Sequence, residues 1–365
     1  MNARLRGYAL FVAVAVLVLA VAPGVLDPFR LGLLAKYLCF AIAALGIGLA
    51  WGQGGMLTLG QGVFFGLGGY SMAMYLKLHD AGSGSLPDFM VWSGVEKLPV
   101  LWKPFSSPVL AIAAAVVVPA LAAVLLGLLV FRQRVRGAYF AILSQALAAA
   151  FVIWLVGQQG LTGGTNGLTH FYDVFGHDPE EDGTKRILYF VVAIVLGVLY
   201  LLARQLVKSR FGRLLVAVRD GEDRVRFLGY NPATVKTITF AVSAAMAGIA
   251  GALYVPVVGI ISPSLLGVVP SIELVVAVAI GGRFSLGGAV LGGVLLNWAH
   301  TSFSEQYPSG WVYLQGFMFI LVIMLAPKGV VGLAGQFGDV IARRRTTTPP
   351  PAPAPAEHTE EVATV

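Results

Sequence analysis

The stretch Pro108–Phe131, PVLAIAAAVVVPALAAVLLGLLVF, decides the fold class, because it holds no charged side chain along its whole length. A helix of about 20 apolar residues crosses the hydrocarbon core of a bilayer, so this stretch is long enough to span it. The pair Ile272–Gly282 and Leu286–Ala299 is shorter, and is either two spans or one broken helix. With these three, the remaining apolar runs give about ten candidate spans: Tyr8–Leu26, Leu31–Ala50, Gly62–Leu78, Gly137–Val156, Ile187–Ala203, Thr237–Ile261 and Trp311–Ala326.

The composition of the 365-residue chain agrees with this pattern, since 57% of the residues are hydrophobic and only 12% are charged. Soluble domains carry about 25% charged residues. We therefore predict an all-α integral membrane protein with about ten transmembrane helices and with glycine-rich broken or re-entrant segments. The polytopic domain is expected over residues 8–336.

The charge distribution predicts the orientation of these helices. The formal net charge is +7, and most of the 25 Lys and Arg residues fall in segments that alternating spans place on one side. Because cytoplasmic segments of membrane proteins are enriched in Lys and Arg, we expect both termini in the cytoplasm. The predicted segments outside the spans are a cytoplasmic N-terminus (1–7), two outer loops (77–107 and 157–186), a cytoplasmic loop (204–236) and a disordered cytoplasmic tail (337–365).

Motifs for phosphate binding, hydrolysis and metal binding are absent from the sequence. It contains no GxxxxGK[ST], HExxH or GxSxG pattern, and its five His residues lack the spacing of metal ligands. Cys39 lies in an apolar run and is expected to be a small buried side chain. We expect no catalytic activity, no metal or cofactor in this chain, and no nucleic-acid partner.

Glu273 is the only acidic residue inside a predicted span. Ionisable residues within the membrane usually mark substrate or ion pathways. A carboxylate shortly after Pro270-Ser271 is also suited to the start of a helix at the membrane interface. The sequence leaves both interpretations open.

The cytoplasmic loop 204–236 holds a predicted short helix between two breaks. Asp220-Gly221 interrupts the first helical pattern, Glu222–Leu228 follows with acidic residues at its start, and Gly229 ends it. A short exposed helix of this kind can dock in a groove of a partner protein. The alternative is a basic connection that binds anionic membrane lipid.

This loop and the span after it contain the motifs SRFGR (209–213), AVRDGE (217–222), GYN (229–231) and AGIAGAL (247–253). Elsewhere the chain contains GQGG (52–55), RGAYFAI (136–142), LTGGTNGL (161–168) and PKGVVGL (327–333). This set resembles permease subunits of bacterial branched-chain amino-acid ABC importers.

The resemblance implies that residues 220–229 form the coupling helix, which contacts a separate ATPase subunit. The coupling residues would be Arg219, Asp220, Gly221, Glu222, Arg224, Leu228 and Gly229. The implied partners are a second related permease, two ATPase subunits that bind ATP and Mg, a periplasmic substrate-binding protein and membrane lipid. The implied location is the bacterial inner membrane.

The substrate is predicted from weaker signals. The outer loops, LPDFMVW (86–92), LWKPF (101–105) and FYDVFG (171–176), look more like the branch of this family that imports urea. Ala138 also stands where amino-acid permeases of this type commonly carry an acidic residue. Urea is therefore the first expected substrate, a branched-chain amino acid is the alternative, and an ATP-independent channel for a small solute is a further one.

Two glycine-rich segments echo each other: GGMLTLG at 54–60 and GGRFSLG at 281–287. Matching broken helices in transporter halves often lie beside the substrate route, although such glycines also permit close helix packing. A Gly-rich turn around Thr165 is either an outer gate or a simple tight turn. The candidate pathway residues are Gln53, Gly55, Thr58, Gln61, Thr165, Asn166, Glu273, Gly282 and Ser285.

Overall fold

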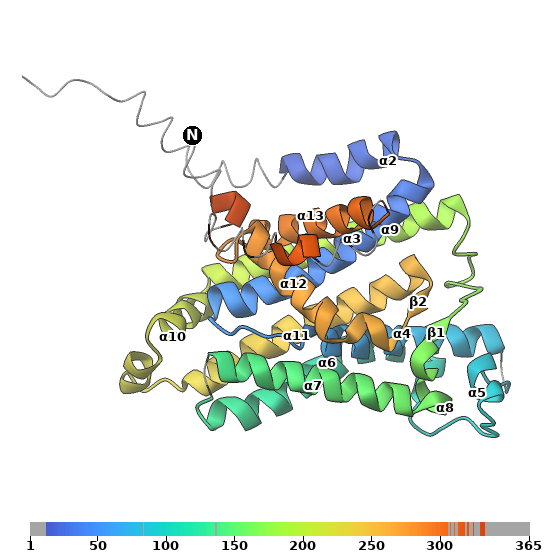
Figure 1. Ribbon diagram of the computed structural model, residues 1–365, viewed down its shortest axis with the longest axis horizontal. Coiled ribbons are helices and arrows are strands. Elements are labelled where there is room, and N and C mark those ends of the chain that lie inside the picture. Colours follow the sequence, from blue (N-terminus) through green and yellow to red (C-terminus); the bar gives the residue numbers. More distant parts are fainter. Residues whose placement is uncertain are drawn as a thin grey trace, which may run out of the picture.

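The computed structural model describes residues 12–82, 84–135 and 137–305, together with residues 307, 310, 313–317, 320, 324 and 329–332. The predicted cytoplasmic N-terminus (1–7) and tail (337–365) lie outside the described residues, as does most of the candidate span Trp311–Ala326. The described part is mostly helical, and its long helices lie side by side (Figure 1).

The helices that build the bundle follow one another with short connections. In chain order the elements are η1 (Leu17–Val21), α2 (Ala22–Val25), α3 (Pro28–Ile47), η2 (Gly48–Gln53), α4 (Gln61–Ala81), α5 (Asp88–Trp92), η3 (Lys103–Ser106), α6 (Pro108–Arg132), α7 (Ala138–Gly157), α8 (Gln159–Thr162), η4 (Gly164–Asn166), β1 (Leu168–Thr169), α9 (Asp182–Lys208), α10 (Arg210–Phe227), α11 (Pro232–Val258), β2 (Ile260–Ile261), η5 (Pro263–Leu266), α12 (Val268–Gly281) and α13 (Leu286–Ser304).

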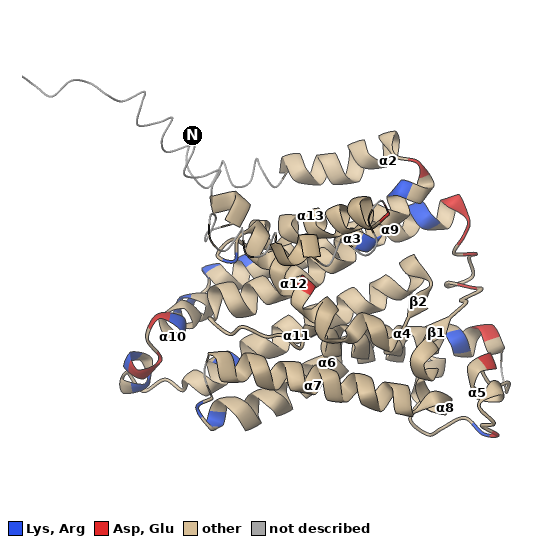
Figure 2. Ribbon diagram, in the orientation of Figure 1, with Lys and Arg blue, Asp and Glu red and all other residues tan. Residues whose placement is uncertain are grey.

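Five helices of the described residues are long and apolar enough to cross a membrane: α3 with η2, α6, α7, α9 and α11. Val12–Val25 and α12 are shorter apolar helices. Lys, Arg, Asp and Glu residues gather near the two ends of the bundle (Figure 2). This arrangement is that of a multi-pass membrane protein, in which charged side chains stay near the water at the two membrane surfaces.

Helix α11 forms the centre of the bundle, where it packs against α3, α4 and α6. Its glycines allow backbones to touch: a Cβ atom on Gly251 would lie 1.9 Å from the carbonyl oxygen of Phe65. Phe240 of α11 packs edge-on against Phe64, Phe131 and Phe140. Small residues thus bring the helices together and aromatic rings fill the space between them.

Two helices begin inside the bundle. The irregular stretch 54–60 leads from η2 to α4. At the start of α4, the Gln61 side chain donates to Ser243, which lies about 16 Å along α11 from its first residue, Pro232. The N-terminal turns of α4 and α12 meet, since the Gly62 N–H donates to Ser271 Oγ at 3.1 Å. The broken-helix prediction therefore holds for the stretch before α4.

The short candidate spans at 272–299 are two separate helices. Helix α12 ends at Gly281, Gly282 turns the chain with a φ of 118°, and α13 begins at Leu286. With 14 residues, α12 is about 21 Å long, which is less than the 30 Å of a bilayer core. It is therefore too short to cross the membrane by itself.

The segments predicted as outer loops are shorter than expected and pack on each other. Helix α4 continues past Lys77 to Ala81, and Lys77, only 4% exposed, pairs with Asp88 at 3.1 Å. Lys77 also donates to the backbone carbonyl of His170 in the second segment. Strands β1 and β2 pair antiparallel, which ties that second segment to the end of α11.

Candidate functional site

Helix α10 is two helical pieces joined at a kink. Ser209 caps its start by accepting from the Gly212 N–H, and Gly221 interrupts the helix with a φ of −169° and a ψ of 76°. The break predicted at Asp220-Gly221 is therefore confirmed. Gly229, with a φ of 87°, follows the end of the second piece.

The second piece of α10 is held by ion pairs and leaves apolar side chains in the open. Glu222 pairs with Lys236 of α11 and with Arg226. Beyond these ion pairs, Phe227 and Leu228 are 92% and 75% exposed. Arg224 is exposed as well. A short helix that ion pairs fix to the bundle, and that exposes apolar side chains at its end, is typical of a protein-docking surface.

Arg219 connects the first piece of α10 to the bundle. Its Nη1 donates to the carbonyl oxygen of Gly52 at 2.8 Å, and its guanidinium lies 5.5 Å from the ring centroid of Phe284. Its Nε donates to Asp220 Oδ1 at 2.8 Å, and this hydrogen bond lowers the pKa of the Asp220 carboxyl. Arg219 thus touches both glycine-rich segments that echo each other in the sequence.

Gly52 and Gln53, which directly precede the first segment, contact the second segment at the end of the bundle that carries α10. Gln53 Nε2 donates to the carbonyl oxygen of Phe284 at 3.0 Å. A Cβ atom on Gly52 would lie only 1.7 Å from the carbonyl oxygen of Arg283. We call this contact, made by residues 51–55, 282–285 and Arg219, the coupling junction.

Several predicted pathway residues belong to the coupling junction and have structural roles there. Gly55 has a φ of 70° and faces Arg219, where a Cβ atom would lie 2.7 Å from Arg219 Cγ. Gly282 makes the turn between α12 and α13, and Ser285 caps α13 by accepting from the Gly288 N–H. Gly55 thus permits close packing against Arg219, and Gly282 and Ser285 shape the turn before α13.

The other predicted pathway residues lie in three separate places. Thr58 and Gln61 are fully buried near the start of α4. Thr165 and Asn166 form an exposed turn, η4, near the β1–β2 end of the bundle. Glu273 lies on α12. The structure therefore does not bring the predicted residues into one lining.

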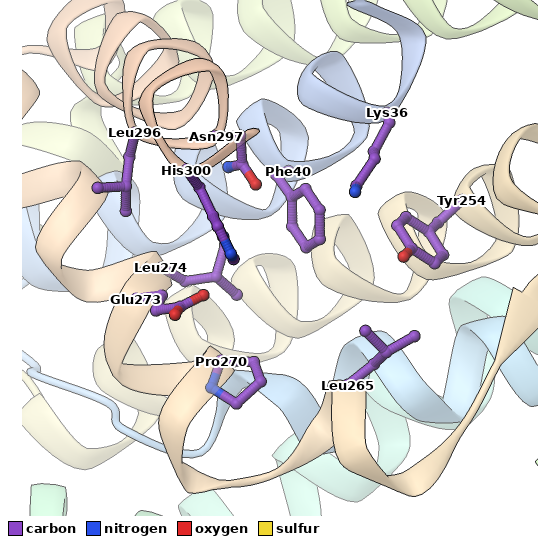
Figure 3. Close-up of a pocket in the computed structure, with 10 residues that line it drawn as sticks. All are labelled: Lys36, Phe40, Tyr254, Leu265, Pro270, Glu273, Leu274, Leu296, Asn297 and His300. Carbon is purple, nitrogen blue, oxygen red and sulfur yellow. The ribbon is translucent and has the colours of Figure 1, made fainter. Parts of the chain in front are cut away.

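Glu273 lines a pocket between α3, α12 and α13, with a volume of ≈ 200 Å³. Figure 3 shows Lys36 of α3 on one wall and Glu273 and His300 on the other, all directed toward the cavity. The remaining lining residues are mostly apolar: Phe40, Tyr254, Leu265, Pro270, Leu274, Leu296 and Asn297. We call it the α12 pocket.

Lys36, Asn297 and His300 were missed by the sequence analysis. Lys36 lies eight residues beyond Pro28, about 12 Å along α3. The available signal for this pocket was a lone lysine in one apolar run and a lone glutamate in another. Sequence could not reveal that the two runs are neighbours.

A multi-pass helical membrane protein with an internal polar pocket and a short, exposed helix at one end of the bundle is the class that this fold and these sites define. The sequence matches the family described as the branched-chain amino acid transport system permease component over residues 29–326. The match covers most of the chain, so the protein belongs to this family, whose members are multi-pass proteins of the inner membrane.

The relatives that the chain resembles are also named as permease proteins. The chain is similar to the high-affinity branched-chain amino acid transport system permease protein LivM of Escherichia coli K12, with 28% identity over 87% of this chain and 74% of LivM. It is 31% identical to BraD of Pseudomonas aeruginosa, a permease of the same description, over 40% of this chain and 47% of BraD. It is 27% identical to the autoinducer 2 import system permease protein LsrC of Escherichia coli O9:H4, over 39% of this chain and 42% of LsrC. No solved structure matches the chain.

Proposed function

We propose that this protein is the permease subunit of an ABC importer that carries a branched-chain amino acid across the inner membrane. The observation that carries the proposal is the family match over residues 29–326, which includes the bundle, the coupling junction and the α12 pocket. The permease itself performs no ATP hydrolysis, because the energy comes from separate ATPase subunits. Urea, which the outer-loop motifs favour, is the second candidate substrate.

The proposed partners are a second related permease, two ATPases with bound ATP and Mg, and a periplasmic substrate-binding protein. The docking element for the ATPase is the second piece of α10, with Phe227 and Leu228 as the apolar contacts. The ion pairs of Glu222 with Lys236 and Arg226 keep this piece fixed to the permease. A force applied to the exposed end of this piece is therefore transmitted to the bundle.

The coupling junction supplies a direct mechanical route from the docking helix to the transport path. Arg219 reaches Gly52, at the end of the long α3–η2 helix, and Phe284, in the turn between α12 and α13. Because α12 carries Glu273, movement of that turn shifts one wall of the α12 pocket relative to α3. ATP-driven closure of the ATPases would in this way change access to the pocket.

Uptake by the purified complex tests this proposal. The permease, its second permease, the ATPases and the binding protein are reconstituted in vesicles, and labelled leucine and urea are offered in parallel. We expect leucine uptake that requires ATP and the binding protein. Urea uptake without leucine uptake would overturn the substrate, and full-rate flux without ATP would overturn the importer.

A further inference from the structure

The α12 pocket holds one positive and one negative side chain on opposite walls. Lys36 extends from α3, and Glu273 extends from α12 (Figure 3). Within the described part of the chain, neither residue takes part in an ion pair. Both side chains are only partly exposed. The pocket therefore presents two separate charges of opposite sign to whatever enters it.

Charges at this depth are costly and are kept where they serve a pathway or a ligand. Counted along the helices from the coupling junction, Glu273 lies about 12 Å into α12 and Lys36 about 25 Å up the α3–η2 helix. Both charges thus lie in the interior of the bundle. A ligand that carries both an ammonium group and a carboxylate matches these two charges.

We propose that the α12 pocket binds the transported amino acid as a zwitterion, with Lys36 facing its carboxylate and Glu273 facing its ammonium group. This assignment rests on the proposed function and names the residues that recognise the substrate. A neutral solute such as urea has no use for two opposite charges, because amides and hydroxyls suffice to bind it.

The rest of the lining fits the same ligand. Phe40, Leu274 and Leu296 add apolar surface to the lining, which suits an aliphatic side chain. Asn297 uses its amide to donate to the Gly293 carbonyl at 2.8 Å, and its own carbonyl oxygen points toward the cavity (Figure 3). That oxygen is an additional acceptor for an ammonium group. The volume of ≈ 200 Å³ restricts the pocket to a small molecule.

Binding of charge-deleted leucine analogues tests the proposal. The purified permease–ATPase complex, without binding protein, is titrated with leucine, with 4-methylpentanoate, which lacks the ammonium group, and with 3-methylbutan-1-amine, which lacks the carboxylate. We expect each analogue to bind wild type about tenfold or more weaker than leucine. Lys36→Met should weaken leucine by a similar factor and leave 3-methylbutan-1-amine unchanged. Glu273→Gln should weaken leucine and leave 4-methylpentanoate unchanged.

Matched controls are available on the outer surface, where Glu96 and Lys97 are both exposed. Glu96→Gln and Lys97→Met should bind all three compounds like wild type. A melting temperature near that of wild type and a single elution peak establish that each pocket variant is folded, and Lys36→Arg and Glu273→Asp should recover part of the leucine affinity.

The outcomes separate this proposal from the proposed function. If the complex transports leucine but both pocket variants keep wild-type affinities for all three compounds, the pocket assignment is wrong and the proposed function stands. If wild type transports urea and not leucine, the proposed substrate is wrong and the assignment falls with it. A loss of leucine binding without the crossed pattern between the two analogues also overturns the assignment.

Discussion

The coupling junction and the α12 pocket are built in opposite ways. At the junction, glycine backbones lie in direct contact, and Arg219 donates hydrogen bonds to Gly52 and Asp220. In the pocket, Lys36 and Glu273 face a cavity and do not pair with each other. The coupling junction is closely packed, and we propose that it transmits movement. The α12 pocket is a cavity, and we propose that it binds a ligand. Substitutions should therefore affect assembly at the first and binding at the second.

The largest effect is expected from Gly52→Leu. A side chain there would meet the Arg283 carbonyl, since even its Cβ atom would lie 1.7 Å from that oxygen. Backbone cannot move away as a flexible side chain can, so we expect a loss of about 3 kcal/mol or more in stability and little assembled complex. Yield and melting temperature of the purified complex measure this.

Gly32→Leu is the matched control, because a Cβ atom on Gly32 of the same long helix meets nothing within 4 Å. It should leave yield and melting temperature near wild type. Normal assembly of Gly52→Leu without transport would instead support the interpretation that the glycine segments line the pathway.

A smaller but functionally severe effect is expected from Arg219→Ala. It removes the hydrogen bond to Gly52 and the contact with the Phe284 ring, while the buried anchors Leu215 and Val218 of α10 remain. The complex should assemble and hydrolyse ATP, but ATP-driven uptake should fall about tenfold. Uptake and ATPase rates measured on the same vesicles provide the check.

Arg210→Ala serves as the control for this variant, since Arg210 is an exposed cation at the start of the same helix. It should keep the ratio of uptake to ATP hydrolysis. An Arg219→Ala complex with a normal ratio would show that the coupling movement takes another route.

In the pocket, the charges are expected to contribute little to folding. Lys36→Met and Glu273→Gln remove charges that form no ion pair with each other, so stability should change by no more than about 1 kcal/mol. Melting temperatures in the absence of leucine measure this. A loss of stability as large as that expected for Gly52→Leu would contradict the proposed difference between the two regions.

The smallest effect concerns the pH dependence of the coupling junction. Hydrogen bonding from Arg219 lowers the pKa of Asp220, so this pairing is present above the usual Asp pKa of about 3.9 and is lost only as the pH falls through the lowered value. Between pH 5 and 8, Asp220→Asn and wild type should therefore show parallel profiles of ATP-driven uptake. A divergence between the profiles in that range would contradict this pairing.

Much of the fold follows from the sequence because the physical signal is local. Apolar length alone located α6, α7, α9 and α11, and glycine and charge patterns located the kink at Gly221. The short length of α12 is also visible in the sequence, because the apolar run Ile272–Gly282 is short. The two echoing glycine segments each contain a break between helices, over 54–60 and at 282–285.

What the sequence could not reveal is which residues meet in space. Gly52, which precedes the first echo segment, packs against the backbone of Arg283 in the second, and a backbone contact of this kind produces no periodicity in the sequence. Lys36 and Glu273 are far apart in the chain and each has an ordinary interpretation near a membrane surface. Their shared pocket depends on α3, α12 and α13 lying together, which is a property of the whole bundle.

The central claim is that the coupling junction links the state of the ATPases to the α12 pocket. The most direct test is the leucine affinity of the complex, measured without nucleotide and again with ADP and vanadate trapped in the ATPases. We predict that the affinity of wild type differs by about tenfold between the two states, and that Arg219→Ala reduces this difference to less than about twofold. An Arg219→Ala complex that keeps the full difference would contradict the account.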